Sequence, residues 1–281
     1  MRLANGGFAN QNQLARGPPG QGGTYSLTPP AGCRGHEVVP YRRGSCCRRL
    51  VNKHQPWKAN DVPVTQTKKT AAWGGFDLST TGLALGVRSK SGEEAYVRTD
   101  MRGATKWKGQ PCFDLKHTPR MILSLLDALE DEGWDVSGMT FSFGVRQHDM
   151  VLLDKNAQLL MPALSWQCNA ATKQVQQLRR MGAEEQVGRV EERFILPKLM
   201  WALGQAPSFR KSVAHVMTTG DWIAAMLTGK SRLSTSDALS NGLLLQQNKR
   251  LAAPVMSRAK LNPKWFPTVI QSGRVVGKVT N

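Results

Sequence analysis

The fold is indicated by one stretch, Gly74-Gly75-Phe76-Asp77-Leu78-Ser79-Thr80-Thr81-Gly82-Leu83-Ala84-Leu85-Gly86-Val87. It predicts a strand that ends on the carboxylate of Asp77, a tight turn of hydroxyl residues and a second apolar strand. Glycine and small hydroxyl residues let the backbone turn sharply and present its N–H groups to an anion. A carboxylate at the strand end can hold a hydrated Mg²⁺, which needs only one or two protein carboxylates. The stretch is therefore a candidate phosphate and magnesium site, with an ordinary surface hairpin as the alternative. It is not a Walker A loop, because no Gly-Lys-Ser/Thr follows.

The first 72 residues differ in composition from the rest of the chain. They hold 11 Lys and Arg against two acids, Glu37 and Asp61, and so carry half of the formal net charge of +18. Gly, Pro and Gln are frequent and apolar periodicity is absent, which predicts a disordered basic leader over residues 1–72. It is a solvated tail, a misassigned start of translation or an Arg-rich transit peptide. Nucleic-acid binding is not expected, because few aromatic residues interleave with the bases.

The spacing of the cysteines and the length of the apolar runs argue against a standard zinc site and against a membrane-spanning protein. Five cysteines occur without a C-x-x-C pair, and Cys33, Cys46, Cys47 and His54 match no standard zinc spacing. We therefore expect free thiols in a reducing cytoplasm. No apolar run approaches the ~20 residues that span a bilayer, and no secretory signal is present, so no membrane partner is expected.

Beyond the leader, the apolar periodicity predicts a mixed α/β domain over residues 73–281. A meander of three antiparallel strands opens it: the strand ending near Asp77, then Leu83–Val87 and Glu94–Arg98, joined by a turn at Ser89–Gly92. An amphipathic helix is predicted over His117–Trp134. The later strands are expected at Met139–Gly144, Met150–Leu153, Gln158–Met161 and Ala214–Met217, and the later helices at Ala170–Met181, Glu191–Leu203, Thr219–Leu227, Ser236–Leu245 and Leu251–Ala259.

Three further polar segments are candidates for the functional site. Val145-Arg146-Gln147-His148-Asp149 directly follows a buried strand, where open α/β sheets place ligands, and offers donors and acceptors to a hydroxyl-rich ligand. In Ser165-Trp166-Gln167-Cys168-Asn169, the indole of Trp166 offers an apolar wall to the carbon face of a sugar. Asp237 follows serines that would cap a helix and is a candidate general base. The structural alternatives are a polar turn, a core tryptophan and a carboxylate in the first turn of a helix.

Taken in order, these segments resemble the FGGY family of carbohydrate kinases, and its pentulose kinases in particular. The matching stretches are the hairpin at 75–82, Arg146-Gln147-His148 with Val151-Leu152-Leu153-Asp154, Pro162-Ala163-Leu164-Ser165-Trp166-Gln167-Cys168, Pro197-Lys198-Leu199-Met200-Trp201, Asp221-Trp222 through Leu227-Thr228-Gly229, and Ser236-Asp237-Ala238. The resemblance implies a ribonuclease H-like domain of the actin and hexokinase type, with a mixed sheet and flanking helices. It also implies a xylulokinase-like phosphotransferase that phosphorylates a ketose hydroxyl with ATP and Mg²⁺.

The resemblance implies a role for each site residue. The implied site comprises Asp77 for Mg²⁺, Thr80, Thr81 and Gly82 for the phosphoryl group, Arg146, Gln147, His148 and Trp166 for the sugar, and Asp237 as catalytic base. Phosphoryl transfer depends mostly on positioning, on charge neutralisation by Mg²⁺ and on one oriented base, which agrees with this set. We expect Asp77 and Asp237 on the same side of one pocket, with His148 between them.

Four positions depart from the family pattern. Ser79 replaces a Gly in the hairpin, Ala84 replaces a Lys that is common after it, Arg146 stands where Gln is usual, and Asp149 stands where Gly is usual. A Cβ at Ser79 narrows the allowed backbone. The charge of Arg146 favours an acidic or phosphorylated ligand, and the missing Lys removes one phosphate partner.

The resemblance covers only the first domain of the family. The ATP-binding second domain is not matched before the chain stops at Asn281, so we expect the chain alone to be inactive or nearly so, since one domain cannot form a closed, water-excluding site. Two alternatives stay open: a non-catalytic sugar-binding or regulatory module, and one half of a split kinase whose ATP-binding half is a separate chain. The sugar stays open too, because Gln147-His148 favours a pentulose or heptulose and Trp166-Gln167-Cys168 favours glycerol.

Overall fold

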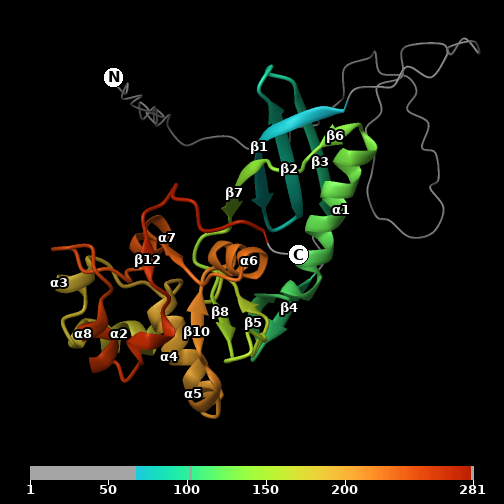
Figure 1. Cartoon of the computed structure of the whole chain (residues 1–281). Coiled ribbons are helices and arrows are strands. Elements are labelled where there is room, and N and C mark those ends of the chain that lie inside the picture. Colours follow the sequence, from blue (N-terminus) through green and yellow to red (C-terminus); the bar gives the residue numbers. More distant parts are fainter. Residues whose placement is uncertain (1–67, 101–102, 280–281) are drawn as a thin grey trace, which may run out of the picture. The chain divides into compact units, whose positions relative to one another are not determined.

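The computed structural model describes residues 68–100 and 103–279 (Figure 1). The predictions for residues 1–67, including the leader and the cysteines before Cys112, lie outside the described residues. The first strand begins at Lys69, so the last four residues assigned to the leader belong to that strand. Cys112 and Cys168 are buried free thiols. Along the described ranges, no helix combines the length and the apolar character needed to cross a bilayer.

A five-stranded mixed sheet opens the described chain. Its strands are β1 (Lys69–Leu78), β2 (Gly82–Ser89), β3 (Glu94–Asp100), β6 (Trp134–Asp135) and β7 (Thr140–Val145). The first three form the predicted antiparallel meander, and β1 also pairs in parallel with β6 and β7. Phe76 and Leu78 are buried and Asp77 between them is exposed, as the alternation of side chains along a strand requires.

The register of this sheet aligns three residues of interest. Asp77 on β1 pairs with Ala84 on β2 and with Gly144 on β7, and Ala84 pairs with Arg98 on β3. Directly paired residues project from the same face of a sheet. Asp77, Ala84 and Arg98 therefore form a row on one face of the sheet, next to the loop that joins β1 to β2, in which Asp77 and Arg98 are exposed and Ala84 between them is buried.

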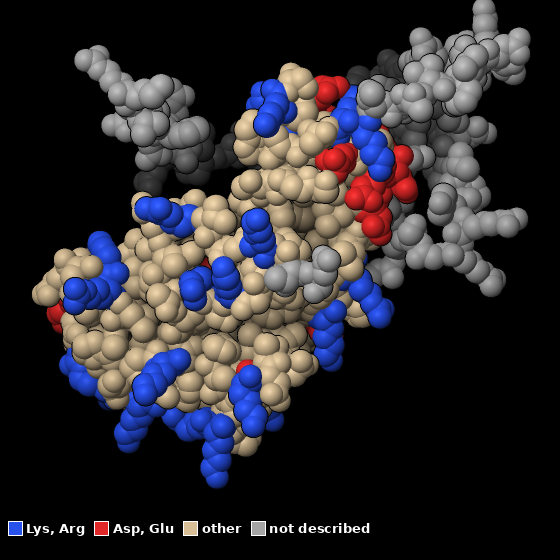
Figure 2. Space-filling model, viewed as in Figure 1, with Lys and Arg blue, Asp and Glu red and all other residues tan. Residues whose placement is uncertain are grey.

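Helix α1 (Thr118–Asp131) flanks the sheet (Figure 1) and contacts β2, β3 and β6. It follows a 3₁₀ turn, η1 (Leu115–His117), that is capped by Asp114. Ile122, Leu125 and Leu129 are buried and belong to the same apolar cluster as Phe76 of the sheet. The outer face of α1 carries acids, which Figure 2 shows as a red patch beside the sheet. The predicted helix is confirmed, and it stops short of Trp134 because Gly133 adopts a φ of +85°.

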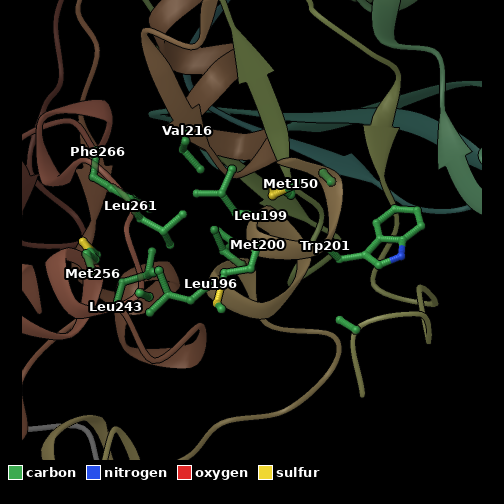
Figure 3. Close-up of a cluster of buried hydrophobic side chains, with 14 of the residues drawn as sticks. Met150, Leu196, Leu199, Met200, Trp201, Val216, Leu243, Met256, Leu261 and Phe266 are labelled. Atoms are coloured by element: carbon green, nitrogen blue, oxygen red, sulfur yellow. The ribbon is translucent and has the colours of Figure 1, made fainter. Parts of the chain in front are cut away.

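The rest of the described chain is mostly helical. It contains β4 (Ala104–Trp107), β5 (Gln110–Phe113), β8 (Val151–Leu153), β9 (Ala163–Leu164), α2 (Thr172–Arg180), α3 (Glu184–Val187), α4 (Ile195–Gln205), α5 (Phe209–Ser212), β10 (His215–Met217), α6 (Thr219–Thr228), β11 (Leu233–Ser234), α7 (Thr235–Ser240), α8 (Ala253–Arg258), η2 (Pro263–Trp265) and β12 (Val269–Ile270). Helix α4 is buried on every side from Ile195 to Leu203. Its Leu196, Leu199 and Met200 form the centre of a second apolar cluster (Figure 3).

The predicted fold class, a mixed sheet with flanking helices, is confirmed, and four local predictions need correction. Strands β4 and β5 were not predicted. The segment Gln158–Met161 forms no strand and contributes an isolated bridge between Leu153 and Leu159. Helix α4 begins at Ile195, later than predicted. Helix α7 ends at Ser240, because Gly242 adopts a φ of +63° and reverses the chain.

Candidate functional site

The turn between β1 and β2 is organised by the hydroxyl of Ser79. Its Oγ accepts the N–H groups of Thr81 at 3.3 Å and of Gly82 at 3.1 Å. Thr80 and Thr81 are exposed, so their hydroxyls face solvent at the tip of the turn. The turn therefore has the predicted hydroxyl-rich edge, but two of its amides already have a partner. A bound phosphate would have to replace the Ser79 hydroxyl to use them.

Asp77 is placed to hold a hydrated magnesium ion. Its carboxylate is exposed at the carboxyl end of β1. Oδ1 lies 3.7 Å from the point where a Cβ at Gly144 would stand, so the absence of a side chain there keeps one flank of the carboxylate open. No cluster of three or more metal-ligating side chains occurs within residues 68–100 and 103–279. One accessible carboxylate fits Mg²⁺, which binds proteins through one or two carboxylates and keeps its other positions for water and phosphate oxygens.

The guanidinium of Arg146 is buried and contacts several groups inside the protein. Its side chain is 5% exposed and forms an ion pair with Asp149, with Nε 2.7 Å from Oδ2. The guanidinium stacks on the ring of Phe113, 3.8 Å from the ring centre, and donates a hydrogen bond to the carbonyl of Ser79. Its charge is therefore neutralised inside the protein. Arg146 connects the hairpin to the loop that follows β7, and its Nη2 is buried without a hydrogen-bond partner among the described residues, so its part in ligand binding stays a prediction.

Lys198 and Asp149 connect the two loops that are predicted to bind sugar, the one that carries His148 and the one that carries Trp166. Lys198 of α4 is fully buried, and its Nζ donates to the carbonyls of His148, Leu164 and Ser165. Asp149 accepts the N–H of Trp166 at 2.9 Å. Burial lowers the pKa of Lys198 to about 8, with the charge of Asp149 acting in the opposite direction. Burial likewise raises the pKa of Asp149, and its pairing with Arg146 opposes that rise.

His148 is held with one ring nitrogen directed at helix α7. Its Nδ1 lies 3.2 Å from Oδ1 of Asn241, and its ring stacks on Phe194. The amide of Asn241 is oriented, because its Nδ2 donates to the carbonyl of Asp237 at 2.9 Å. Oδ1 of Asn241 therefore accepts from Nδ1–H, which leaves Nε2 as an acceptor. Burial lowers the pKa of His148, which favours this neutral form.

Trp166 and Gln147 lie on the accessible side of these loops. Trp166 is 40% exposed even though it is a large aromatic residue, so it is not a core tryptophan. Gln147 is exposed as well. An exposed indole offers apolar stacking to a sugar and an exposed amide offers hydrogen bonds, so the two side chains have the chemistry that a sugar-binding surface needs.

Asp237 shares one hydroxyl with a second, buried carboxylate. Thr218 Oγ1 lies 3.0 Å from Oδ2 of Asp221 and 3.1 Å from Oδ2 of Asp237. Asp221 also accepts the N–H of Ser234 at 3.1 Å. Burial, and next the charge of Asp237, raise the pKa of Asp221 to about 7. A hydroxyl has a single hydrogen, so a protonated Asp221 that donates to Thr218 leaves the hydrogen of Thr218 for the carboxylate of Asp237.

The loop that follows β7 connects the two segments carrying the predicted aspartates. Arg146 bonds to the hairpin at Ser79, and His148 bonds to Asn241 at the end of α7. Val145 packs against Gly220 at the start of α6, next to the Thr218 that contacts Asp237. These contacts connect the two segments, and the expected grouping of Asp77, His148 and Asp237 in one pocket stays a prediction.

Sequence reasoning missed several residues that hold the site. They are Arg98, Lys198, Thr218, Asp221 and Asn241. A signal existed for Lys198, because a lone cation inside an apolar helix is buried only when it is paired. The other four contribute through contacts between segments distant in sequence.

The comparisons with known proteins identify the family of the chain. Residues 75–281 match the N-terminal domain of the FGGY family of carbohydrate kinases. A xylulose kinase of Lactococcus lactis subsp. lactis is 25% identical over 209 residues, which is 70% of this chain and 41% of that protein.

Solved structures extend the likeness to the fold. A ligand-bound xylulose kinase and a gluconate kinase, both of Lactobacillus acidophilus, superpose with TM-scores of 0.67. They are 18% and 19% identical, and the matches cover 75% and 74% of this chain and 44% of each structure. The chain spans less than half the length of the curated relatives it matches. By the match to the family's N-terminal domain and by its fold, the chain belongs to the FGGY family of carbohydrate kinases.

Proposed function

We propose that this domain binds a ketose of the xylulose type and supplies the base for its ATP-dependent phosphorylation. The observation that carries the proposal is the loop Arg146–His148, which bonds to the Asp77 hairpin through Ser79 and to the Asp237 helix through Asn241. A sugar bound at this loop would lie between a carboxylate suited to Mg²⁺ and a carboxylate suited to proton transfer. The names of the relatives, xylulose kinases, support the choice of sugar.

Each residue then has a step in the reaction. The indole of Trp166 stacks on the carbon face of the sugar, and Gln147 and Nε2 of His148 bond to its hydroxyls. Asp237, which accepts a hydrogen bond from the hydroxyl of Thr218, accepts the proton of the attacking hydroxyl. Asp77 would hold Mg²⁺, which would neutralise charge on the phosphates. Thr80 and Thr81 face the transferring group from the tip of the hairpin.

Turnover is proposed to need a second, nucleotide-binding domain. The matched region is an N-terminal domain, and a single open domain does not exclude water from the transferring phosphoryl group. By itself this domain should bind sugar and release ADP no faster than the uncatalysed background. A coupled ADP-release assay on the 281-residue chain with D-xylulose checks this, and turnover well above background would contradict it.

Sugar binding is tested with two tryptophans that are matched in exposure. Trp166 is 40% exposed at the proposed site, and Trp73 is 53% exposed on β1. Trp166→Ala should weaken D-xylulose binding at least about tenfold, since stacking and loop ordering contribute on the order of 1.4 kcal/mol. Trp73→Ala should leave it unchanged. Equal effects of the two substitutions, measured by calorimetry, would reject the proposed sugar site.

A second candidate function is a non-catalytic sugar-binding module. Ser79 favours it, because its hydroxyl satisfies two amides of the hairpin that a phosphate would otherwise use. Asp237→Asn distinguishes the two functions when the chain is mixed with a nucleotide-binding half of a xylulose kinase. For a kinase, the substitution abolishes phosphorylation and preserves sugar binding. For a module, the mixture with the unaltered chain shows no phosphorylation at all.

A further inference from the structure

Arg98 reaches the phosphate hairpin from a neighbouring strand. It lies on β3 directly opposite Ala84 of β2, and Ala84 lies opposite Asp77 of β1. The guanidinium of Arg98 extends along this row to the turn, where Nη2 lies 3.1 Å from the hydroxyl of Thr81. A permanent cation therefore stands at the tip of the hairpin, on the same exposed face as the Asp77 carboxylate.

Gly82 is what allows the guanidinium to lie across the turn. A Cβ at Gly82 would stand 2.9 Å from Nε and 3.1 Å from Nη2 of Arg98, and 2.9 Å from the carbonyl of Thr99. Cβ atoms do not approach other atoms this closely, so another residue at position 82 would require Arg98 and the backbone of β3 to shift. The absence of a side chain at position 82 thus leaves room for Arg98 beside the turn.

Arg98 supplies a positive charge beside Ala84, an uncharged residue of β2. Position 84 carries Ala, with 5% of its surface exposed, so β2 offers no cation at this point of the sheet. The register places the two positions side by side on adjacent strands, so a charge on either one serves the same region of the sheet face. Arg is better suited than Lys to an exposed phosphate, because its planar guanidinium binds two oxygens at once.

We propose that Arg98 is a phosphoryl-binding residue that supplies from β3 the cation absent at position 84. The inference rests on the proposed kinase function and adds a residue to the phosphate side of that site. Arg98 and the hydroxyl of Thr81 together contact the phosphate oxygens, while Ser79 retains the turn amides. Two charge-assisted contacts at an exposed site predict weak, salt-sensitive binding of phosphate alone.

The test follows the backbone amide signals of residues 80–82 by NMR while inorganic phosphate is added to the 281-residue chain at low ionic strength. Arg98→Met should weaken the phosphate-dependent shifts about tenfold, in line with the loss of one charge-assisted contact. Arg88→Met is the matched control, because Arg88 is an exposed arginine on β2, 3.6 Å from Glu94 and remote from the turn. It should change the apparent affinity less than twofold.

A rescue variant separates a specific role from a loss of structure. Adding Ala84→Lys to Arg98→Met should restore most of the lost affinity, since the new ammonium group would stand beside the vacated position. Hairpin shifts that are as large in Arg98→Met as in the unaltered chain would overturn the inference and leave the proposed kinase function standing. Absence of phosphate-dependent shifts from the hairpin of the unaltered chain would overturn both.

Discussion

Replacing Asp221 by Asn should make this domain more stable at neutral and alkaline pH. The carboxylate is 9% exposed, lies one threonine hydroxyl away from Asp237, and has its pKa raised from 3.8 to about 7. Asn reproduces the hydrogen bonds of the protonated acid, because its Oδ1 accepts the N–H of Ser234 and its Nδ2 donates to Thr218. The substitution therefore removes the titrating carboxyl group of Asp221 and keeps its hydrogen bonds to Ser234 and Thr218.

Proton linkage determines whether the stability of the domain rises or falls with pH. Because the folded pKa lies above the unfolded pKa, the folded state binds more protons between pH 4 and pH 7, and its stability falls as the pH rises through that window. The rise of the Asp221 pKa from 3.8 to about 7, at 1.36 kcal/mol per pKa unit, limits the loss of unfolding free energy to about 4 kcal/mol. We expect the free energy of unfolding of the Asn variant to lose this pH dependence. At pH 8 it should exceed that of the unaltered chain by up to about 4 kcal/mol.

The assay is urea unfolding followed by tryptophan fluorescence at pH 5 and pH 8. The difference between the two proteins isolates Asp221, since other titrating groups contribute equally to both. Asp127→Asn, at an exposed carboxylate of α1, is the control and should leave the pH dependence unchanged. Parallel curves for the Asp221→Asn variant and the unaltered chain would refute the reasoning, because they would mean that Asp221 is ionised in the folded state.

Three further predictions concern the other polar contacts of the site. Arg146→Gln should cost about 3 kcal/mol of unfolding free energy, since it leaves the buried Asp149 without its partner, and combining it with Asp149→Gly should cost much less than the sum of the two single changes in a double-mutant cycle. Ser79→Gly should tighten phosphate binding several-fold in the NMR titration, because it frees the amides of Thr81 and Gly82; weaker binding would show that the hydroxyl itself contacts the anion. Lys198→Met should destabilise the fold by about 1–3 kcal/mol, since three carbonyls lose a buried donor, and should also weaken D-xylulose binding measured by calorimetry, whereas loss of stability with unchanged binding would contradict a role in shaping the sugar loops.

The sequence predicted the parts of the fold that depend on local patterns. The meander followed from the alternation around Phe76 and from the turn after Ser89, and α1 followed from the spacing of Ile122, Leu125 and Leu129. Strands β4 and β5 were missed because they are four residues each and β5 contains Pro111, which weakens a strand pattern. Short strands of this kind are specified by the neighbour they pair with.

The candidate site was predicted less completely, because its geometry depends on contacts between distant segments. The burial of Arg146 is decided by Asp149 and by the ring of Phe113, and a list of residue types does not show which way a guanidinium turns. Arg98 was within reach of sequence reasoning. Once the turn places Arg88 opposite Glu94, an antiparallel register places Ala84 opposite Arg98. That residue was missed because the expected strand was used only to define the fold.

The amine of Lys198 connects the buried helix α4 to both loops of the proposed sugar site. The loops that carry His148 and Trp166 both contact this group, and it projects from the part of helix α4, Ile195 to Leu203, that is buried. A small displacement of that helix would move both loops of the proposed sugar site together. Repacking the apolar neighbours of α4 is therefore expected to alter binding at the proposed site without changing any side chain proposed to contact the sugar.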